Sequence, residues 1–128
     1  MFKIENNTIN ITRGDIGTIS ISAQNEDGTS YIFNKGDIIR FSVMKAGNCN
    51  IVYMTKDVQV MKDTDSVDVE LVSINTKIGN IISKPTKYWY EIVLNPDTMA
   101  QTIVGYDEEG PKLFILYPEA SFNEEPGE

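Results

Sequence analysis

The stretch from residue 87 to residue 94 constrains the fold of this 128-residue chain more than any other. It reads Lys-Tyr-Trp-Tyr-Glu-Ile-Val-Leu, and nearly every side chain is aromatic, β-branched or long and apolar. Successive side chains of a β-strand alternate between two faces. One face of this stretch is apolar, and the other places a carboxylate between large residues. The first face holds Tyr88, Tyr90, Ile92 and Leu94, and the second holds Trp89, Glu91 and Val93. This pattern predicts a central strand of an antiparallel sheet, with its second face partly covered.

Shorter segments with the same alternation recur about every ten residues and are separated by turn signals such as Asp27-Gly28. The predicted strands cover residues 8–12, 17–23, 38–45, 51–60, 67–71, 101–104 and 113–117. The run 51–60 contains a polar interruption and reads equally as two short strands or one bent strand. Residues 73–79 predict one helical turn that ends at Gly79, with Ile74 and Ile78 capping the open end of the core.

Seven to nine short strands without a long amphipathic helix predict an all-β fold, an antiparallel immunoglobulin-like β-sandwich. A small closed barrel is the alternative. The length suits one domain, which we place at residues 1–118. Residues 119–128 carry four carboxylates, a proline and a glycine, and predict an acidic, flexible tail.

The amino-acid composition excludes or disfavours several classes of function. Eleven Lys and Arg against nineteen Asp and Glu give a net charge of -8, which disfavours nucleic acid as a partner. The chain has no histidine, so Ser-His and Cys-His relays and imidazole metal ligands are excluded. Cys49 is the single cysteine and has no cation closer in sequence than Lys45, which predicts an inert thiol. We expect no enzymatic activity and no cofactor.

The beginning of the chain has neither a basic segment nor an apolar run of signal-peptide length, and no later segment approaches eighteen apolar residues. The sequence therefore predicts synthesis in a cytosol, no signal peptide and no membrane span.

The densest carboxylate cluster runs from Asp63 through Asp65 and Asp68 to Glu70. Hard oxygen ligands at alternate positions suit calcium, and paired carboxylates can act as acid and base. The cluster lacks the glycine and the terminal glutamate of a helix-loop-helix calcium loop. We therefore favour a solvated loop that runs into a strand over both a metal site and a hydrolase.

The candidate binding residues are Trp89 and its neighbours Tyr88 and Tyr90, which can form a sugar-stacking platform or an interface anchor. A strand tryptophan in a sandwich is more often part of the core. Tyr88 or Tyr90 can also make a tyrosine corner, in which the hydroxyl bonds to backbone across the loop that enters the strand. The tripeptide 13–15, Arg-Gly-Asp, occurs in integrin ligands, but a local turn explains it here.

Several motifs follow one another in a particular order. They lie at 11–17 (ITRGDIG), 27–28 (DG), 35–37 (KGD) leading into 39–43 (IRFSV), 69–71 (VEL), 88–92 (YWYEI) and 101–103 (QTI). The series resembles the immunoglobulin-like N-terminal domain of phage baseplate upper proteins, found in phages and prophages of Gram-positive bacteria, over residues 8–118. Two departures from that family are the acidic tail in place of further domains and a longer approach to the central strand at 80–86.

The resemblance implies a structural and interaction module that links receptor-binding parts to the particle. It implies a location in the virion tail or baseplate, other tail or baseplate proteins as partners, and no catalytic residues. Edge strands such as 51–60 can add to the sheet of another chain, which would also allow a homo-oligomer. The alternative function is a carbohydrate-binding module that uses exposed aromatic side chains around Trp89.

Overall fold

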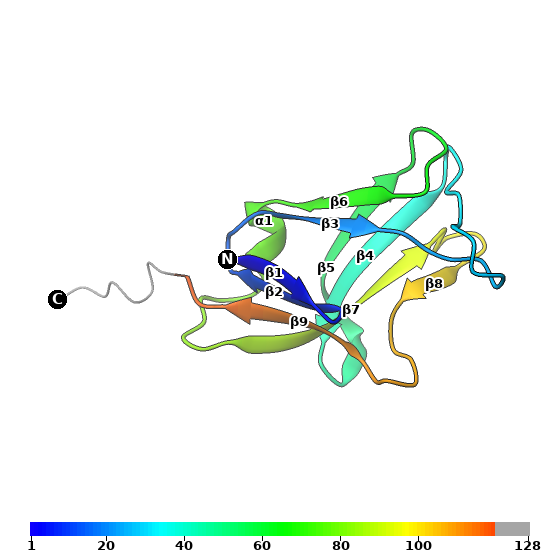
Figure 1. The fold of residues 1–128 in the computed structure, drawn as a ribbon. Coiled ribbons are helices and arrows are strands. Elements are labelled where there is room, and N and C mark those ends of the chain that lie inside the picture. The colour runs from blue at the N-terminus through cyan, green and yellow to red at the C-terminus, as the bar shows by residue number, and fades with distance from the viewer. Residues whose placement is uncertain (120–128) are drawn as a thin grey trace, which may run out of the picture.

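A computed structural model describes residues 1–119 (Figure 1). These residues form one four-residue helix, α1 (Ser73–Thr76), and nine strands, which confirms the all-β prediction. The strands are β1 (Phe2–Glu5), β2 (Thr8–Thr12), β3 (Gly17–Ile21), β4 (Ile38–Lys45), β5 (Asn48–Gln59), β6 (Val67–Leu71), β7 (Thr86–Leu94), β8 (Gln101–Val104) and β9 (Lys112–Tyr117). Among residues 1–119, no helix is long or apolar enough to span a membrane.

The larger sheet contains seven strands in the order β1-β2-β9-β7-β4-β5, with β8 beside β7. The strand predicted to be central, β7, pairs antiparallel with β4 on one side and with β9 and β8 on the other. Both edges of β7 are thus paired through backbone hydrogen bonds, as expected for a central strand.

The sheet is mixed and not purely antiparallel as predicted, because β2 runs parallel to β9, from Ile9 beside Phe114 to Thr12 beside Tyr117. No hairpin joins these two strands, so no short loop imposes an antiparallel direction. The alternation of apolar and polar residues is the same for either direction, and therefore the sequence pattern did not distinguish them.

The second sheet consists of β3 and β6, paired antiparallel from Gly17 beside Leu71 to Ile21 beside Val67. Apolar residues of both strands point inward and are buried, whereas Asp68 and Glu70 point outward into solvent. This two-stranded sheet lies across one face of the larger one (Figure 1).

The core lies between the sheets, and its largest fully buried side chains are Phe33, Phe41 and Phe114. The Phe41 ring packs against Tyr90 with ring centroids 5.6 Å apart and against Phe114 at 6.2 Å. Burying one such ring contributes about 2 to 3 kcal/mol to stability. The packing therefore ties β4, β7 and β9 together at the centre of the sheet.

Three strands differ from the prediction by more than one residue, and one of them is β3, which ends at Ile21 and not at residue 23. β1, which the sequence analysis did not predict, is short and pairs with β2 through a turn at Asn6 and Asn7, which both have positive φ. Asparagine tolerates this left-handed conformation better than most residues. β5 is one strand that begins at Asn48, and its polar stretch does not interrupt it because Arg40 binds the Asp57 carboxylate from the adjacent strand.

The helical turn at α1 is confirmed, but its predicted capping role is wrong for one isoleucine. Ile78 is buried, whereas Ile74 is 82% exposed, because the helix ends at Thr76 and residues 74 and 78 do not share one helix face. Thr76 closes this end of the core instead. Its buried hydroxyl donates to the Asp15 carbonyl at 2.8 Å and accepts from the Gly14 amide at 3.0 Å.

Glu119 is the first residue of the predicted acidic tail. Glu119 forms an ion pair with Arg13, whose side chain is only 10% exposed. The remaining tail residues, 120–128, lie outside the described part of the structure.

Candidate functional site

The three aromatic residues predicted as a binding site do not share one surface. Tyr90 is 5% exposed in the core, and its hydroxyl donates a 2.6 Å hydrogen bond to the backbone carbonyl of Asn7. Burial raises the pKa of Tyr90 to about 12. The hydroxyl thus bonds to backbone, as a tyrosine corner does, but at the β1–β2 turn and not at the loop that enters β7. Tyr90 is structural.

Tyr88 lies on the same face of β7, near one end of the core, and is half-buried. Its ring meets that of Tyr53, from β5, edge to face with centroids 5.3 Å apart. Burial, with the nearby Tyr53, raises the pKa of Tyr88. The side chain therefore extends the core toward the β5 edge.

Trp89 alone of the three points to the outward face of the larger sheet, where it is half-buried against Tyr106. The ring centroids lie 5.6 Å apart and the planes meet at 65°. Tyr106 is 71% exposed. It reaches Trp89 because β8 and β9 run one after the other along the same side of β7, and the intervening residues 105–111 loop out between them.

A depression of about 270 Å³ adjoins Trp89 and Tyr106 and is mainly apolar. Other residues that line it are Met44, Cys49, Tyr90, Glu91, Pro111 and Lys112. The Lys112 ammonium is not free to meet a ligand, because it pairs with Asp107 at 2.8 Å and lowers the pKa of that carboxyl. Tyr106 was not predicted as a site residue, since no local pattern in the sequence shows that a loop 17 residues after Trp89 folds back onto it.

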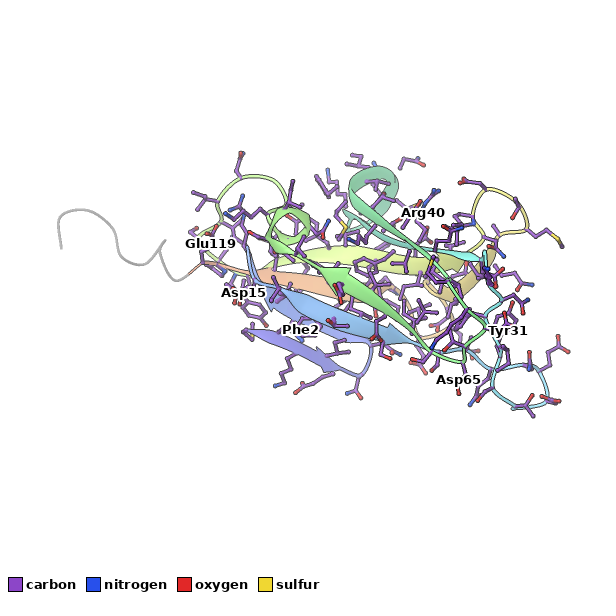
Figure 2. All side chains as sticks on the ribbon, turned by 90° about the horizontal axis from the view of Figure 1, so that it is seen from above. Phe2, Asp15, Tyr31, Arg40, Asp65 and Glu119 are labelled. Carbon is purple, nitrogen blue, oxygen red and sulfur yellow. The ribbon has the colours of Figure 1, made fainter. Side chains whose placement is uncertain are left out.

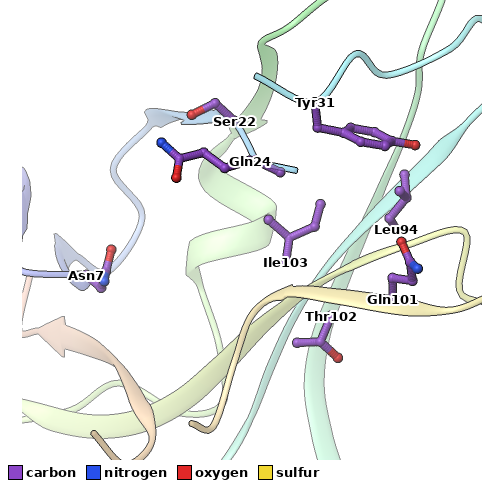
Figure 3. Close-up of a pocket in the computed structure, with 9 residues that line it drawn as sticks. Asn7, Ser22, Gln24, Tyr31, Leu94, Gln101, Thr102 and Ile103 are labelled. Atoms are coloured by element: carbon purple, nitrogen blue, oxygen red, sulfur yellow. The ribbon is translucent and has the colours of Figure 1, made fainter. Parts of the chain in front are cut away.

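A larger depression of about 730 Å³ lies between β8 and the segment that follows β3 (Figure 3). None of its nine lining residues is charged. Its polar side chains come from Asn7, Ser22, Gln24, Tyr31, Gln101 and Thr102, and Figure 3 shows Ile103 among them. None of these residues carries a binding signal in the sequence, because each polar side chain among them is ordinary in its own segment.

The carboxylate cluster forms a loop that runs into β6, as favoured from the sequence. The Asp63 carboxylate accepts a 2.9 Å hydrogen bond from the Lys35 amide, Asp65 is exposed, and Asp68 points outward from β6. Within residues 1–119, no group of three or more His, Cys, Asp or Glu side chains is arranged to hold a metal ion.

The Arg-Gly-Asp tripeptide forms the local turn that was predicted. Arg13 pairs with Glu119 and donates to the Gly79 carbonyl at 2.9 Å, and Asp15 pairs with the terminal amine of Met1. Figure 2 shows Asp15 and Glu119 at one end of the molecule, with Tyr31 and Asp65 at the other. The charged groups of the tripeptide are thus engaged within the fold.

The outer edge of β5 pairs with no strand among the described residues. Three large apolar side chains on this strand are exposed, namely Ile51, Val52 and Tyr53. The stretch from residue 48 to residue 55 contains no charged residue. Further along β5, the Asp57 carboxylate is held by Arg40 through two hydrogen bonds of 2.8 and 3.0 Å.

The molecule therefore offers an aromatic depression, a larger uncharged depression and an apolar strand edge, all suited to binding by stacking or hydrogen bonding. Comparisons of the chain with models of protein families, with curated proteins and with solved structures found no match.

Proposed function

We propose that this chain is a non-enzymatic, immunoglobulin-like interaction module of a phage or prophage tail baseplate, which links receptor-binding parts to the particle. Its partners are other tail or baseplate proteins, and it reaches the virion after synthesis in the bacterial cytoplasm. The order of motifs over residues 8–118 motivates the assignment to a baseplate.

The strand arrangement supports the immunoglobulin-like part of this proposal. In that fold the strands C, F and G form one sheet, C′ extends it at the C edge, and B and E belong to the other sheet. Here β4, β7 and β9 match C, F and G, β5 matches C′, and β3 pairs with β6 as B pairs with E.

The edge of β5 is the observation that carries the interaction role. Soluble proteins usually protect such an edge with charges, proline or a covering loop. The first eight residues of β5 carry neither charge nor proline, and Ile51, Val52 and Tyr53 are exposed beside unpaired backbone. A strand from another chain can pair there through main-chain hydrogen bonds, either from a baseplate partner or from a second copy.

Immunogold labelling tests the assignment. An antibody to this chain, applied to particles from an induced lysate of the source bacterium, is expected to place gold at the tail end. Antibody preadsorbed with the purified chain is the control. Label absent from particles, with the protein only in the soluble fraction, would contradict the baseplate role.

A second candidate function is carbohydrate binding at Trp89, favoured by its half-buried ring and the adjoining apolar depression. This candidate site pairs Trp89 with Tyr106, and Tyr90 also lines the adjoining depression, whereas Tyr88 does not. Cell-wall polysaccharide is expected to change the emission of Trp89, the single tryptophan, and Tyr106→Ala is expected to weaken that response. Emission that does not respond to cell-wall sugars rules this function out.

A further inference from the structure

The larger sheet is incomplete beside β8. On the side away from β7, β9 pairs with β2, but β8 has no neighbour among residues 1–119. No backbone hydrogen bond outside the sheet ladder involves residues 101–104 in this part of the chain. The outward N–H and C=O groups of β8 therefore have no protein partner there, although unpaired backbone groups are costly when covered.

The missing neighbour lies in line with β2. Because Ile9 is beside Phe114 in a parallel ladder, a β2 extended toward the N-terminus would continue along β9 and on to β8. The chain instead turns back at Asn6 and Asn7 into β1. The Tyr90 hydroxyl holds the Asn7 carbonyl and so fixes this turn.

The depression of about 730 Å³ occupies this position. Asn7 lies at one end of it, Gln101, Thr102 and Ile103 line it along β8, and Ser22 and Gln24 line it from the segment after β3 (Figure 3). We propose that this depression is a vacant strand position that accepts an extended, uncharged segment of a partner polypeptide, which pairs with β8.

The residues that line the depression indicate what kind of peptide segment can bind there. A net charge of -8 is spread over the chain, yet none of the nine lining residues is charged, so a charged segment would lose hydration without gaining an ion pair. The chain's own residues 120–128 include Glu124, Glu125 and Glu128 and match poorly. Ile103 and Leu94 supply an apolar floor, and the amide side chains can donate to and accept from a peptide backbone.

The length of β8 sets the minimum length of the segment. Four residues of strand span about 13 Å, so a partner needs at least four residues in extended conformation. Alternation places its apolar side chains toward Ile103 and Leu94 and its polar ones toward solvent. The proposal refines the interaction role above by naming the chemistry of one partner segment.

Peptide selection on the purified chain tests the proposal. From a random library of displayed eight-residue peptides, those that bind the wild-type chain are selected. Peptides that also bind Ala23→Trp, a variant whose indole fills the depression, are then removed. The enriched peptides are expected to be uncharged and alternating, to bind Ala23→Trp at least tenfold more weakly, and to slow hydrogen exchange at residues 101–104. Ile74→Lys, on the exposed helical turn α1, is the matched control and is expected to bind them as the wild type does.

A second variant, Gln101→Lys, places a charge on an exposed part of the lining and is expected to weaken binding as well, which guards against misfolding of Ala23→Trp. Three results would overturn the proposal: no enrichment, binding to both lining variants that is as tight as to the wild type, or binding of neutral oligosaccharides in the depression with no effect of peptides. Because the measurement uses purified protein and the baseplate role is tested on particles, either can fail alone.

Discussion

The Tyr90 hydroxyl donates a hydrogen bond of 2.6 Å to the backbone carbonyl of Asn7, a residue 83 positions earlier in the chain. This bond joins the central strand of the larger sheet to the turn between β1 and β2. The bond anchors the β1–β2 hairpin at the turn where the chain reverses. β2 therefore ends where a neighbour of β8 would begin, and the strand position beside β8 stays vacant.

Replacement of Tyr90 by phenylalanine is expected to destabilise the fold by about 1 kcal/mol, because the core ring stays while the hydrogen bond is lost. Urea unfolding measures this as a lower midpoint with an unchanged slope. An unchanged midpoint would show that solvent replaces the hydroxyl without cost.

The loss of folding stability at alkaline pH depends on the same Tyr90 hydroxyl. The pKa of Tyr90 is raised from 10.0 to about 12 in the folded chain, so its contribution is complete below pH 10 and is lost between about pH 10 and 12. A pKa difference of two units lowers the free energy of unfolding by about 3 kcal/mol over this pH range. Tyr90→Phe is expected to lack this part of the alkaline decline, as measured by unfolding at a series of pH values, and an identical decline in both proteins would refute the assignment.

Gly17 is packed under the Phe2 ring, and a methyl group added there would come within 2.5 to 2.7 Å of ring atoms. Gly17→Ala is therefore expected to displace β1 and to cost about 1 to 3 kcal/mol. In the Phe2→Ala background the same substitution is expected to cost much less. A double-mutant cycle with no coupling between the two positions would contradict this contact.

The Arg40 guanidinium lowers the pKa of the Asp57 carboxyl through two hydrogen bonds. Arg40→Ala is expected to return that pKa toward its ordinary value, which NMR titration of the carboxyl carbon reports directly. The stabilising effect of the pair is present above the unfolded pKa of Asp57 and is lost as pH falls through the folded value. The carboxyl of Asp27, whose pKa is lowered by hydrogen bonds from Thr29 and not by Arg40, serves as the internal reference.

Trp89 is expected to report on Tyr106 through its fluorescence. Tyr106→Ala uncovers the indole edge and is expected to shift the emission to longer wavelength, whereas Tyr53→Ala, which affects the Tyr88 contact, is expected to leave it unchanged. Equal spectra for Tyr106→Ala and wild type would mean that the 105–111 loop does not cover Trp89 in solution.

Val52→Lys tests the β5 edge. Val52 is 51% exposed, so the substitution is expected to change the free energy of unfolding by less than about 0.5 kcal/mol. It adds a charge to an otherwise uncharged edge and is expected to weaken any self-association seen by sedimentation. Thr18→Lys, on the exposed face of β3, adds the same charge away from the β5 edge and controls for a general effect of charge.

The sequence by itself determined the strands and their inward faces. In β3, β6 and β7 the alternation of apolar and polar residues identified the buried side before any contact was known, because side-chain direction along a strand is a local property. The turn at residues 13–15 and the single helical turn at α1 were also readable, since turn chemistry depends on neighbouring residues.

Only the tertiary structure decided how these elements combine. The parallel pairing of β2 with β9, the contact of Trp89 with Tyr106 and the vacant position beside β8 join residues that are far apart in the chain. Local periodicity holds no information on strand direction, on how a loop folds back, or on where a sheet lacks a strand. Those features follow from which pairings bury the most apolar surface and satisfy the most backbone groups together.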